Sequence, residues 1–229
     1  MEVLKLIKNT IQVMKTKHIN YLREDGQKIK HKPWLGDLFS FLYDSIMTRS
    51  IFPKKFGASI KEHTRFLENE CIDIHNRRVL ELATGSGSIT EVLPCDNTYR
   101  GIDISEGLLR IAYRKFLLQG FEDFELFVCD AEALPFEDDQ FDLCICNLSL
   151  NFFNNLDRVV KELKRVIIPE GVFICSVPVP ERNTKDSEIR GHLLSESELR
   201  TLFEQNGFSI SSYDFVNGAI LYFKGIKID

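Results

Sequence analysis

From residue 79 onward, short apolar runs alternate with stretches in which apolar residues recur every three or four positions. The short runs have the length and the β-branched or aromatic content of buried strands. They are Val79–Leu82, Tyr99–Ile104, Phe124–Cys129, Phe141–Asn147 and Gly171–Val177. Strands that alternate with helices in this way predict a parallel sheet with helices on both faces.

Three helices are predicted from the stretches with helical spacing. Residues 105–119 carry one apolar face and are followed by Gly120, which suits the position after a helix C-terminus. Residues 156–168 are amphipathic in the same way. The third helix follows Ser195, because Ser195 and Glu198 form a capping-box pattern.

Two further strands, Phe208–Val216 and Ala219–Ile226, are separated only by Asn217-Gly218. This dipeptide is a strong hairpin signal, and strands joined by so short a turn are antiparallel. The predicted fold is therefore a doubly wound, mostly parallel seven-stranded α/β sheet that ends in an antiparallel hairpin.

Residues 1–75 are predicted to form a helical extension to a main domain of residues 76–229. Within this extension, an apolar stripe near the N-terminus predicts one helix, and another helix is predicted from about Ala58 to Asn69. That stripe consists of Leu4, Ile7, Ile11 and Met14. It suits a helix packed on the domain, a lid over a ligand cleft, or a helix on a membrane surface.

Composition narrows the class of protein. The 229 residues suffice for one sizeable core. A balance of 29 Lys and Arg against 34 Asp and Glu gives a net charge of −5, without the broad basic field that nonspecific nucleic-acid binding uses, so nucleic acid is disfavoured as a partner. No apolar run reaches the roughly 18–20 residues of a membrane span, and lysines interrupt the N-terminal stretch. A cytoplasmic protein is expected.

The six cysteines are too few for a disulfide scaffold, and most lie inside apolar runs. We interpret them as reduced core thiols. Cys144 and Cys146 share a face of one predicted strand, but no second pair or nearby histidine completes a zinc site, so no metal is predicted.

Candidate ligand-binding residues follow the first three strands. A turn with Gly85 and Gly87 allows a ligand to approach the backbone closely. Asp103 ends the second strand, where a carboxylate can accept both hydroxyls of a ribose. Asp130 ends the third strand, where it can accept from an adenine amine while Ala131 leaves room for the ring. Taken singly, each is also compatible with an ordinary turn or a helix-start acid.

Two nucleotide-binding classes lose support at this turn. The dinucleotide fingerprint G-x-G-x-x-G needs a third glycine, where this chain has Thr90. Phosphate-loop NTPases need a Gly-Lys-Ser/Thr sequence, which does not follow the turn.

Residues 79–90 resemble motif I of the class I S-adenosylmethionine-dependent methyltransferases, E/D-x-G-x-G-x-G, with Glu81 as the acid and Ala83 in place of the first glycine. The resemblance continues through residues 101–105, 130–136, 141–147 and 163–172. The most similar branch contains the ubiquinone and menaquinone C-methyltransferases. The resemblance implies S-adenosylmethionine as cofactor and S-adenosylhomocysteine as product.

The resemblance also implies roles for individual residues. Asp103 is expected to bind the ribose hydroxyls, and Asp130 and Ala131 to flank the adenine. Gly85 to Gly87 are expected to line the methionine moiety, and Asn147 to face the cofactor. The full set expected at the cofactor is Tyr43, Glu81, Ala83, Thr84, Gly85, Ser86, Gly87, Asp103, Ile104, Asp130, Ala131 and Asn147.

Other candidates keep two interpretations each. Tyr43 resembles a residue that closes over the methionine end in relatives, and core packing explains it equally well. His192 lies in a loop where relatives place substrate contacts, and it also suits a solvated loop; His18 and His31 have less support. Phe152 and Phe153 suit an apolar or aromatic acceptor or simple packing. No general base is assigned.

Three functions remain. The first is methyl transfer to a small-molecule acceptor by in-line displacement, in which the enzyme aligns the acceptor and excludes water. The second is a catalytically silent partner protein that binds S-adenosylmethionine or S-adenosylhomocysteine, motivated by Ala83 and the unassigned base. The third is an NAD-dependent oxidoreductase. The sequence specifies neither the acceptor nor the oligomeric state.

Overall fold

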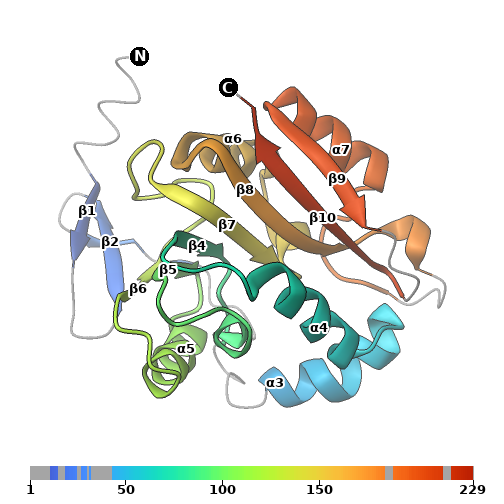
Figure 1. The fold of residues 1–229 in the computed structure, drawn as a ribbon, viewed down its shortest axis with the longest axis horizontal. Helices are drawn as coiled ribbons and strands as arrows, with labels where there is room; N and C mark the ends of the chain where they lie inside the picture. The colour runs from blue at the N-terminus through green and yellow to red at the C-terminus, as the bar shows by residue number, and fades with distance from the viewer. Residues whose placement is uncertain are drawn as a thin grey trace.

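The computed structural model describes residues 11–14, 19–24, 27–29, 31, 43–183, 188–213 and 218–228. Within them, one ten-stranded sheet has the order β1-β2-β6-β5-β4-β7-β8-β10-β9, and β3 pairs with β2 beside this path (Figure 1). The strands are β1 (Ile11–Met14), β2 (Asn20–Glu24), β3 (Gln27–Lys28), β4 (Arg78–Leu82), β5 (Thr98–Asp103), β6 (Phe124–Val128), β7 (Phe141–Asn147), β8 (Ile167–Pro178), β9 (Phe208–Tyr213) and β10 (Ile220–Lys227). All seven predicted strands are present, but the predicted count of seven is wrong, because the N-terminal region adds three.

The five strands β6, β5, β4, β7 and β8 pair in parallel, as predicted. Strand β10 is antiparallel to both β8 and β9. Tyr213 of β9 lies opposite Tyr222 of β10, which is the register that a turn centred on Asn217-Gly218 produces. The antiparallel pairing is confirmed, whereas residues 214–217 of the turn lie outside the described residues.

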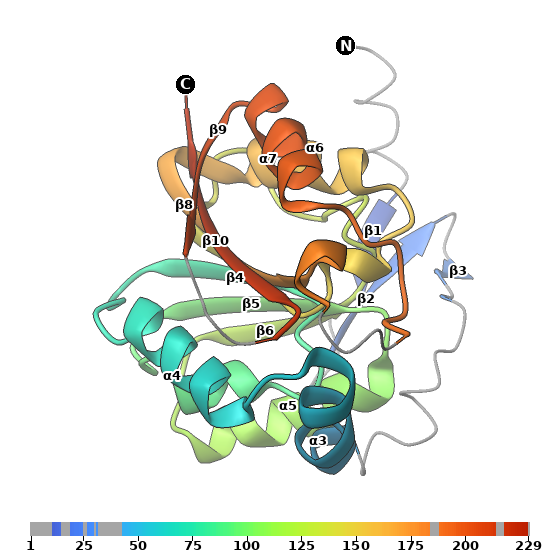
Figure 2. The same ribbon diagram turned by 90° about the vertical axis from the view of Figure 1, so that its right-hand side faces the viewer.

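Helices cover both faces of the sheet. Figure 2 shows α6 and α7 on one side and α3, α4 and α5 on the other. The α-helices are α3 (Tyr43–Ile46), α4 (Ile60–Cys71), α5 (Glu106–Leu118), α6 (Leu156–Val166) and α7 (Glu196–Gln205), and a π-helix η2 (Met47–Phe56) follows α3. Among the described helices, none is both long enough and apolar enough to cross a membrane.

The sheet separates two apolar cores. On the α6–α7 side, the rings of Phe173 and Phe203 stack 5.3 Å apart, next to Leu163. On the α4–α5 side, Tyr99 and Phe116 lie 4.3 Å apart. All five side chains are fully buried. Because burial of one large apolar side chain stabilises a fold by roughly 1.5–3 kcal/mol, each helix is anchored mainly by such contacts.

The predicted helix ends are found in the structure. Ser195 Oγ accepts a hydrogen bond from Glu198 N at 3.2 Å, and Ser195 N donates to Glu198 Oε2 at 2.7 Å, which completes the capping box. Gly120 follows α5 with a φ of +81°, as expected for a helix C-terminus. The helix predicted over residues 156–168 is α6, and it ends two residues early at Val166, because Ile167 already pairs with Phe141 of β7.

The N-terminal region differs from its prediction. Residues Ile11–Met14, the C-terminal half of the apolar stripe, form strand β1 and not a helix, whereas Leu4 and Ile7 lie outside the described residues. Strand β2 pairs with the edge of β6, where Asn20 lies opposite Phe127. An open edge of β6 would leave backbone groups unpaired, and this pairing outweighs the local helical pattern. The helix predicted near residues 58–69 is confirmed as α4.

Candidate functional site

The carboxyl ends of β4, β5, β6 and β7 meet at one edge of the sheet. Strand β4 lies between β5 and β7, so the strand order reverses at β4: β5 and β6 follow on one side, and β7 and β8 on the other. Ligands of open α/β sheets bind at such a reversal of strand order. Two cavities lie here, and they share Ala83, Gly85, Leu148 and Ser149. We name them the Asp103 cavity and the Glu81 cavity.

The Asp103 cavity has a volume of about 260 Å³. It lies above the ends of β5 and β6, next to the loop that follows β7. Its lining consists of Ala83, Gly85, Ile102, Asp103, Ile104, Leu108, Cys129, Asp130, Ala131, Leu148, Ser149, Phe152, Phe153 and Asn154. Six of the predicted site residues therefore line this cavity together: Ala83, Gly85, Asp103, Ile104, Asp130 and Ala131.

Backbone N–H groups fix the carboxylate of Asp103. Its Oδ2 accepts from Gly85 N and its Oδ1 from Ser105 N, both at 2.8 Å. These bonds connect the loop after β4 to the end of β5 and orient the carboxylate at the cavity wall. A carboxylate held in this way can accept hydroxyl groups of a ligand as charge-assisted hydrogen bonds.

The opposite end of the Asp103 cavity suits a flat ring. Asp130 accepts a hydrogen bond from Glu132 N at 3.0 Å, and Ala131 is buried. Ile104 and Phe152 are 41% and 49% exposed, although both are large apolar side chains. Exposed apolar groups beside a cavity provide the faces on which an aromatic ligand stacks.

The glycine-containing loop after β4 has three residues in left-handed conformation. Gly85 has a φ of +57°, and a Cβ placed there would have no neighbour nearer than 3.9 Å, so glycine keeps the backbone open to the cavity. Gly87 has a φ of +76°, and a Cβ there would lie 2.9 Å from the Cα of Ala112 in α5. Gly87 therefore packs on a helix. It lies outside both cavities, and its prediction as a lining residue is not supported by its position.

Ala83 takes the place of the first glycine of motif I and keeps a glycine-like backbone. Its φ is +53°, a left-handed conformation that costs an alanine roughly 1–2 kcal/mol. Its methyl group lies where both cavities meet. The loop is followed by a single 3₁₀ turn, η3 (Ser88–Glu91).

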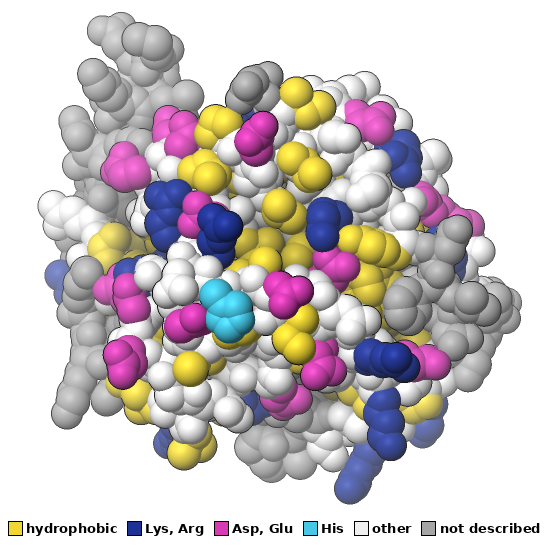
Figure 3. Space-filling model, viewed as in Figure 1, with side chains coloured by type: hydrophobic (Ala, Val, Ile, Leu, Met, Phe, Trp, Pro, Cys, Tyr) yellow, Lys and Arg dark blue, Asp and Glu magenta, His cyan; other side chains and the backbone are white. Residues whose placement is uncertain are grey.

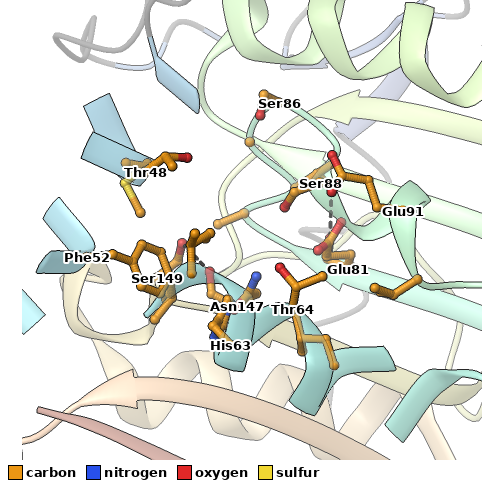
Figure 4. Close-up of a pocket in the computed structure, with 18 of the residues that line it drawn as sticks. Thr48, Phe52, His63, Thr64, Glu81, Ser86, Ser88, Glu91, Asn147 and Ser149 are labelled. Carbon is orange, nitrogen blue, oxygen red and sulfur yellow. Dashed lines mark hydrogen bonds between the residues drawn. The ribbon is translucent and has the colours of Figure 1, made fainter. Parts of the chain in front are cut away.

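The Glu81 cavity has a volume of about 160 Å³ and lies between the loop after β4, the end of β7 and the N-terminal helices η2 and α4 (Figure 4). Its polar lining includes Thr48, His63, Thr64, Glu81, Thr84, Ser86, Ser88, Glu91, Lys115, Asn147 and Ser149. Glu81, Thr84, Ser86 and Asn147 were predicted at the site, and the cavity brings them together.

Glu81 is a buried acid without a cationic partner among its described contacts. The hydroxyl of Tyr99 donates to Glu81 Oε2, and Thr84 Oγ1 lies 3.2 Å from Tyr99 Oη. Burial raises the pKa of Glu81 to about 8, and the charge of Asp103 acts in the same direction. The side chain is therefore mostly protonated at neutral pH and can ionise when a cation enters the cavity.

Asn147, which was predicted to face the cofactor, ends β7 and lines the Glu81 cavity. Its Oδ1 accepts from Ser176 Oγ, and Ser176 is its partner in the ladder between β7 and β8. This bond orients the amide at the carboxyl end of the sheet.

His63 was not predicted and lies in the same cavity. The ring is 3% exposed, and its Nδ1 lies 2.9 Å from Tyr222 Oη on β10. Figure 4 shows it beside Asn147. A signal was present in the sequence, because His63 falls on the same helical face as Phe66 and Leu67, three and four residues later.

The other candidate histidines have different positions. His192 is exposed, and its backbone N donates to Asn151 O at 2.7 Å; its side chain lines neither cavity. His31 is close enough to Asp130 for that charge to raise its pKa, although burial has the larger effect and lowers it. His18 and the side chain of Tyr43 lie outside the described residues.

Charges of both signs are distributed over the face of the molecule seen in Figure 3. Acidic and basic side chains alternate there without a broad basic area among the described residues. This distribution agrees with the net charge of −5.

Comparisons with known proteins point to one family. Residues 80–175 match the model of a methyltransferase domain. Demethylmenaquinone methyltransferase of Thermotoga maritima is 30% identical over 163 residues, which are 70% of this chain and 66% of that protein. Ubiquinone/menaquinone biosynthesis C-methyltransferase UbiE of Rickettsia bellii is 34% identical over 108 residues, 44% of each chain. The chain thus spans less than two thirds of these relatives.

A solved structure shows how far the fold is shared. The [4+2]-cyclase SpnF has a TM-score of 0.68 at 16% identity, over 85% of this chain and 94% of that chain. At this low identity the likeness establishes the fold alone.

Proposed function

We propose that this chain is a class I S-adenosylmethionine-dependent methyltransferase of the branch that contains the ubiquinone and menaquinone C-methyltransferases, and that it methylates a small-molecule acceptor by in-line displacement. The observation that carries the proposal is the pair of cavities joined at Ala83 and Gly85. One presents a fixed carboxylate beside apolar faces, and the other is polar. These two chemistries match a cofactor with an adenosine half and an amino-acid half.

The residues present fit the adenosine half in the Asp103 cavity. Asp103 would accept the ribose hydroxyls, since Gly85 and Ser105 already orient its oxygens. Asp130 would accept from the adenine amine, with Ile104 over the ring. The aromatic side chains Phe152 and Phe153 line this cavity too, so they would contact the cofactor in addition to any acceptor.

The amino-acid half fits the Glu81 cavity. An ammonium group beside Glu81 would lower the pKa of that acid and share its charge. Open backbone at Gly85 admits the ligand between the two cavities. Lys115 lines the same cavity, and its ammonium group would pair with the carboxylate of the amino-acid half.

The protein's contribution to the reaction is mainly positional. Bound S-adenosylmethionine supplies an activated methyl group on a sulfonium. The chain's own residues would orient the acceptor in line with that group, and residues of η2 and α4, which line the Glu81 cavity, would limit the access of water. Alignment of two reactants in this way can contribute roughly 7–11 kcal/mol to lowering a barrier.

The first test is calorimetric titration of the full chain with S-adenosylmethionine, S-adenosylhomocysteine and NAD. Binding of the first two in the micromolar range, with no heat from NAD, is the expected result. Reduced naphthoquinones without the ring methyl group are the first acceptors to assay, because relatives of this chain include a demethylmenaquinone methyltransferase and a ubiquinone/menaquinone biosynthesis C-methyltransferase. Binding of NAD alone would contradict the proposal.

One observation favours a second function, a catalytically silent binding protein. The methyl group of Ala83 stands at the junction of the cavities, where the motif has glycine. A cofactor that binds without any transfer to a panel of small acceptors would support this function. Transfer to any of them would exclude it.

A further inference from the structure

The His63 ring lies in the Glu81 cavity with one nitrogen held and the other without a partner. Nδ1 lies 2.9 Å from Tyr222 Oη, and the ring centroid is 5.1 Å from that of Phe52. Nε2 is buried and has no partner at hydrogen-bonding distance and angle within the described part of the chain, and the Asn147 side chain lies close to the ring. A buried polar atom left in this state costs roughly 1–3 kcal/mol. A ligand that bonds to Nε2 would remove this cost.

The position of His63 along the sheet indicates which part of a ligand reaches it. The Asp103 cavity lies above β5 and β6, on one side of the switch point. His63 contacts Tyr222 of β10 and lies beside Asn147 at the end of β7, on the other side. The His63 ring therefore lies on the β7–β10 side of the Glu81 cavity, on the side away from the adenosine half of the cofactor.

Methylation of a carbon, oxygen or nitrogen atom removes one hydrogen from the acceptor. We propose that His63 Nε2 contacts the acceptor and accepts this proton. The acceptor atom forms a bond to the methyl carbon, and the electron pair of the broken carbon–sulfur bond stays on sulfur. The proton released from the acceptor goes to the lone pair of Nε2. This inference rests on the proposed methyl transfer.

The charge balance of the cavity agrees with this role. Burial lowers the pKa of His63 to about 4. Hydrogen bonding by the Asn147 side chain raises the pKa, but it offsets only part of this shift. The ring is therefore neutral before the reaction, when a second cation beside a sulfonium would be repelled. Transfer removes the sulfonium charge as the imidazole gains one, so the net charge in the cavity does not change.

The role requires one tautomer. Nδ1 has to carry the hydrogen and donate it to Tyr222 Oη, which leaves the Nε2 lone pair free for the proton. Tyr222 then acts as a positioning residue that holds the ring and its tautomer.

The tautomer can be measured without knowledge of the acceptor. The full chain, labelled with ¹⁵N in its histidine rings, would be examined by NMR at pH 7 with saturating S-adenosylhomocysteine. His63→Gln identifies the signals, and His75→Gln is the matched control, because His75 is exposed and paired with Asp96 at 2.8 Å. We expect a protonated Nδ1 and an unprotonated Nε2. The opposite tautomer would overturn the proposal.

Cofactor affinity separates an acceptor contact from a cofactor contact. We expect His63→Gln to bind S-adenosylhomocysteine within about threefold of the wild type, because the lost group faces the acceptor. A loss of more than tenfold would place His63 on the cofactor and overturn the proposal. If the variant does not fold, His→Gln variants at the other four histidines assign the His63 signals by elimination, and the wild-type tautomer decides.

Turnover provides the third readout. With a demethylated naphthohydroquinone as probe, kcat of His63→Gln should fall by about 100-fold or more, the usual range for a lost general base, whereas His75→Gln keeps its rate. An unchanged kcat would overturn the proposal. If the wild type binds the cofactor but does not methylate this probe, the acceptor class is wrong, and the tautomer and the affinity still support or overturn the role of His63.

Discussion

The Asp103 cavity and the Glu81 cavity share one loop but hold their polar groups in opposite ways. In the first, two backbone N–H groups at 2.8 Å satisfy the carboxylate of Asp103. In the second, Glu81 has a pKa of about 8 and His63 has a buried nitrogen without a hydrogen bond. A satisfied carboxylate is organised for binding, whereas a protonated acid and an unsatisfied imidazole respond to the charge of a ligand. We infer that the two halves of the site divide affinity and proton chemistry between them.

The largest expected effect is on the pH dependence of stability through Glu81. Its pKa rises from 4.5 to about 8 on folding, so the folded state keeps a proton that the unfolded chain releases. The stabilising contribution is complete below pH 4.5 and is lost as the pH rises through 8, at up to about 1.4 kcal/mol per pH unit. Glu81→Gln should remove this slope in urea unfolding between pH 5 and 9.

The same substitution at the exposed Glu68 of α4 is the control, and it should leave the pH dependence unchanged. If wild type and Glu81→Gln lose stability equally with rising pH, Glu81 is ionised in the folded state. The contrast between the cavities would then fail.

The second effect concerns the packing behind the shared loop. Gly87→Ala places a Cβ 2.9 Å from the Cα of Ala112 in a left-handed conformation, and we expect it to destabilise the fold by about 2 kcal/mol or more. Gly120→Ala has the same kind of φ with no atom within 4 Å, so it should cost only about 1 kcal/mol. Denaturant unfolding measures both. Equal losses would show that Gly87 is needed for its φ alone.

The third effect is on cofactor affinity. Asp103→Ala should weaken S-adenosylhomocysteine by more than tenfold, about 1.4 kcal/mol, because charge-assisted bonds to the ribose are lost. It should weaken 5′-methylthioadenosine, which lacks the amino-acid half, by a similar factor. Glu81→Gln should weaken only S-adenosylhomocysteine. Calorimetry on both ligands would reject the assignment of the two cavities if Asp103→Ala spared either of them.

The smallest effect is expected where the cavities meet. Ala83→Gly relieves a left-handed alanine but adds backbone entropy to the unfolded chain, so a net stabilisation of about 0.5 kcal/mol is expected. It also restores the glycine of the motif. Thermal unfolding together with cofactor titration tests this prediction, and a destabilised variant would mean that the Ala83 methyl group packs usefully.

Local signals in the chain account for much of the fold. Strands β4 to β10 and helices α5, α6 and α7 were predicted within a few residues, because alternating apolar runs and the Ser195–Glu198 capping box act over short distances. The pairing of β1 with β2 and of β2 with β6 was not predicted, because a stripe at helical spacing gives no information about an open edge on a strand more than a hundred residues later.

The sequence by itself determined the residues that follow each strand, since the carboxyl ends of parallel strands always meet at one edge. Asp103 and Asp130 were predicted in this way, and both line the Asp103 cavity, whereas Asn147 was predicted from the family resemblance and lines the Glu81 cavity. Only the tertiary structure decided that Gly87 packs on α5 and that His63 reaches the cavity. Both depend on which elements lie against each other: α5 crosses behind the loop, and β10 brings Tyr222 to a ring 159 residues earlier in the chain. Contacts at that separation are set by packing of the whole sheet and not by the local pattern.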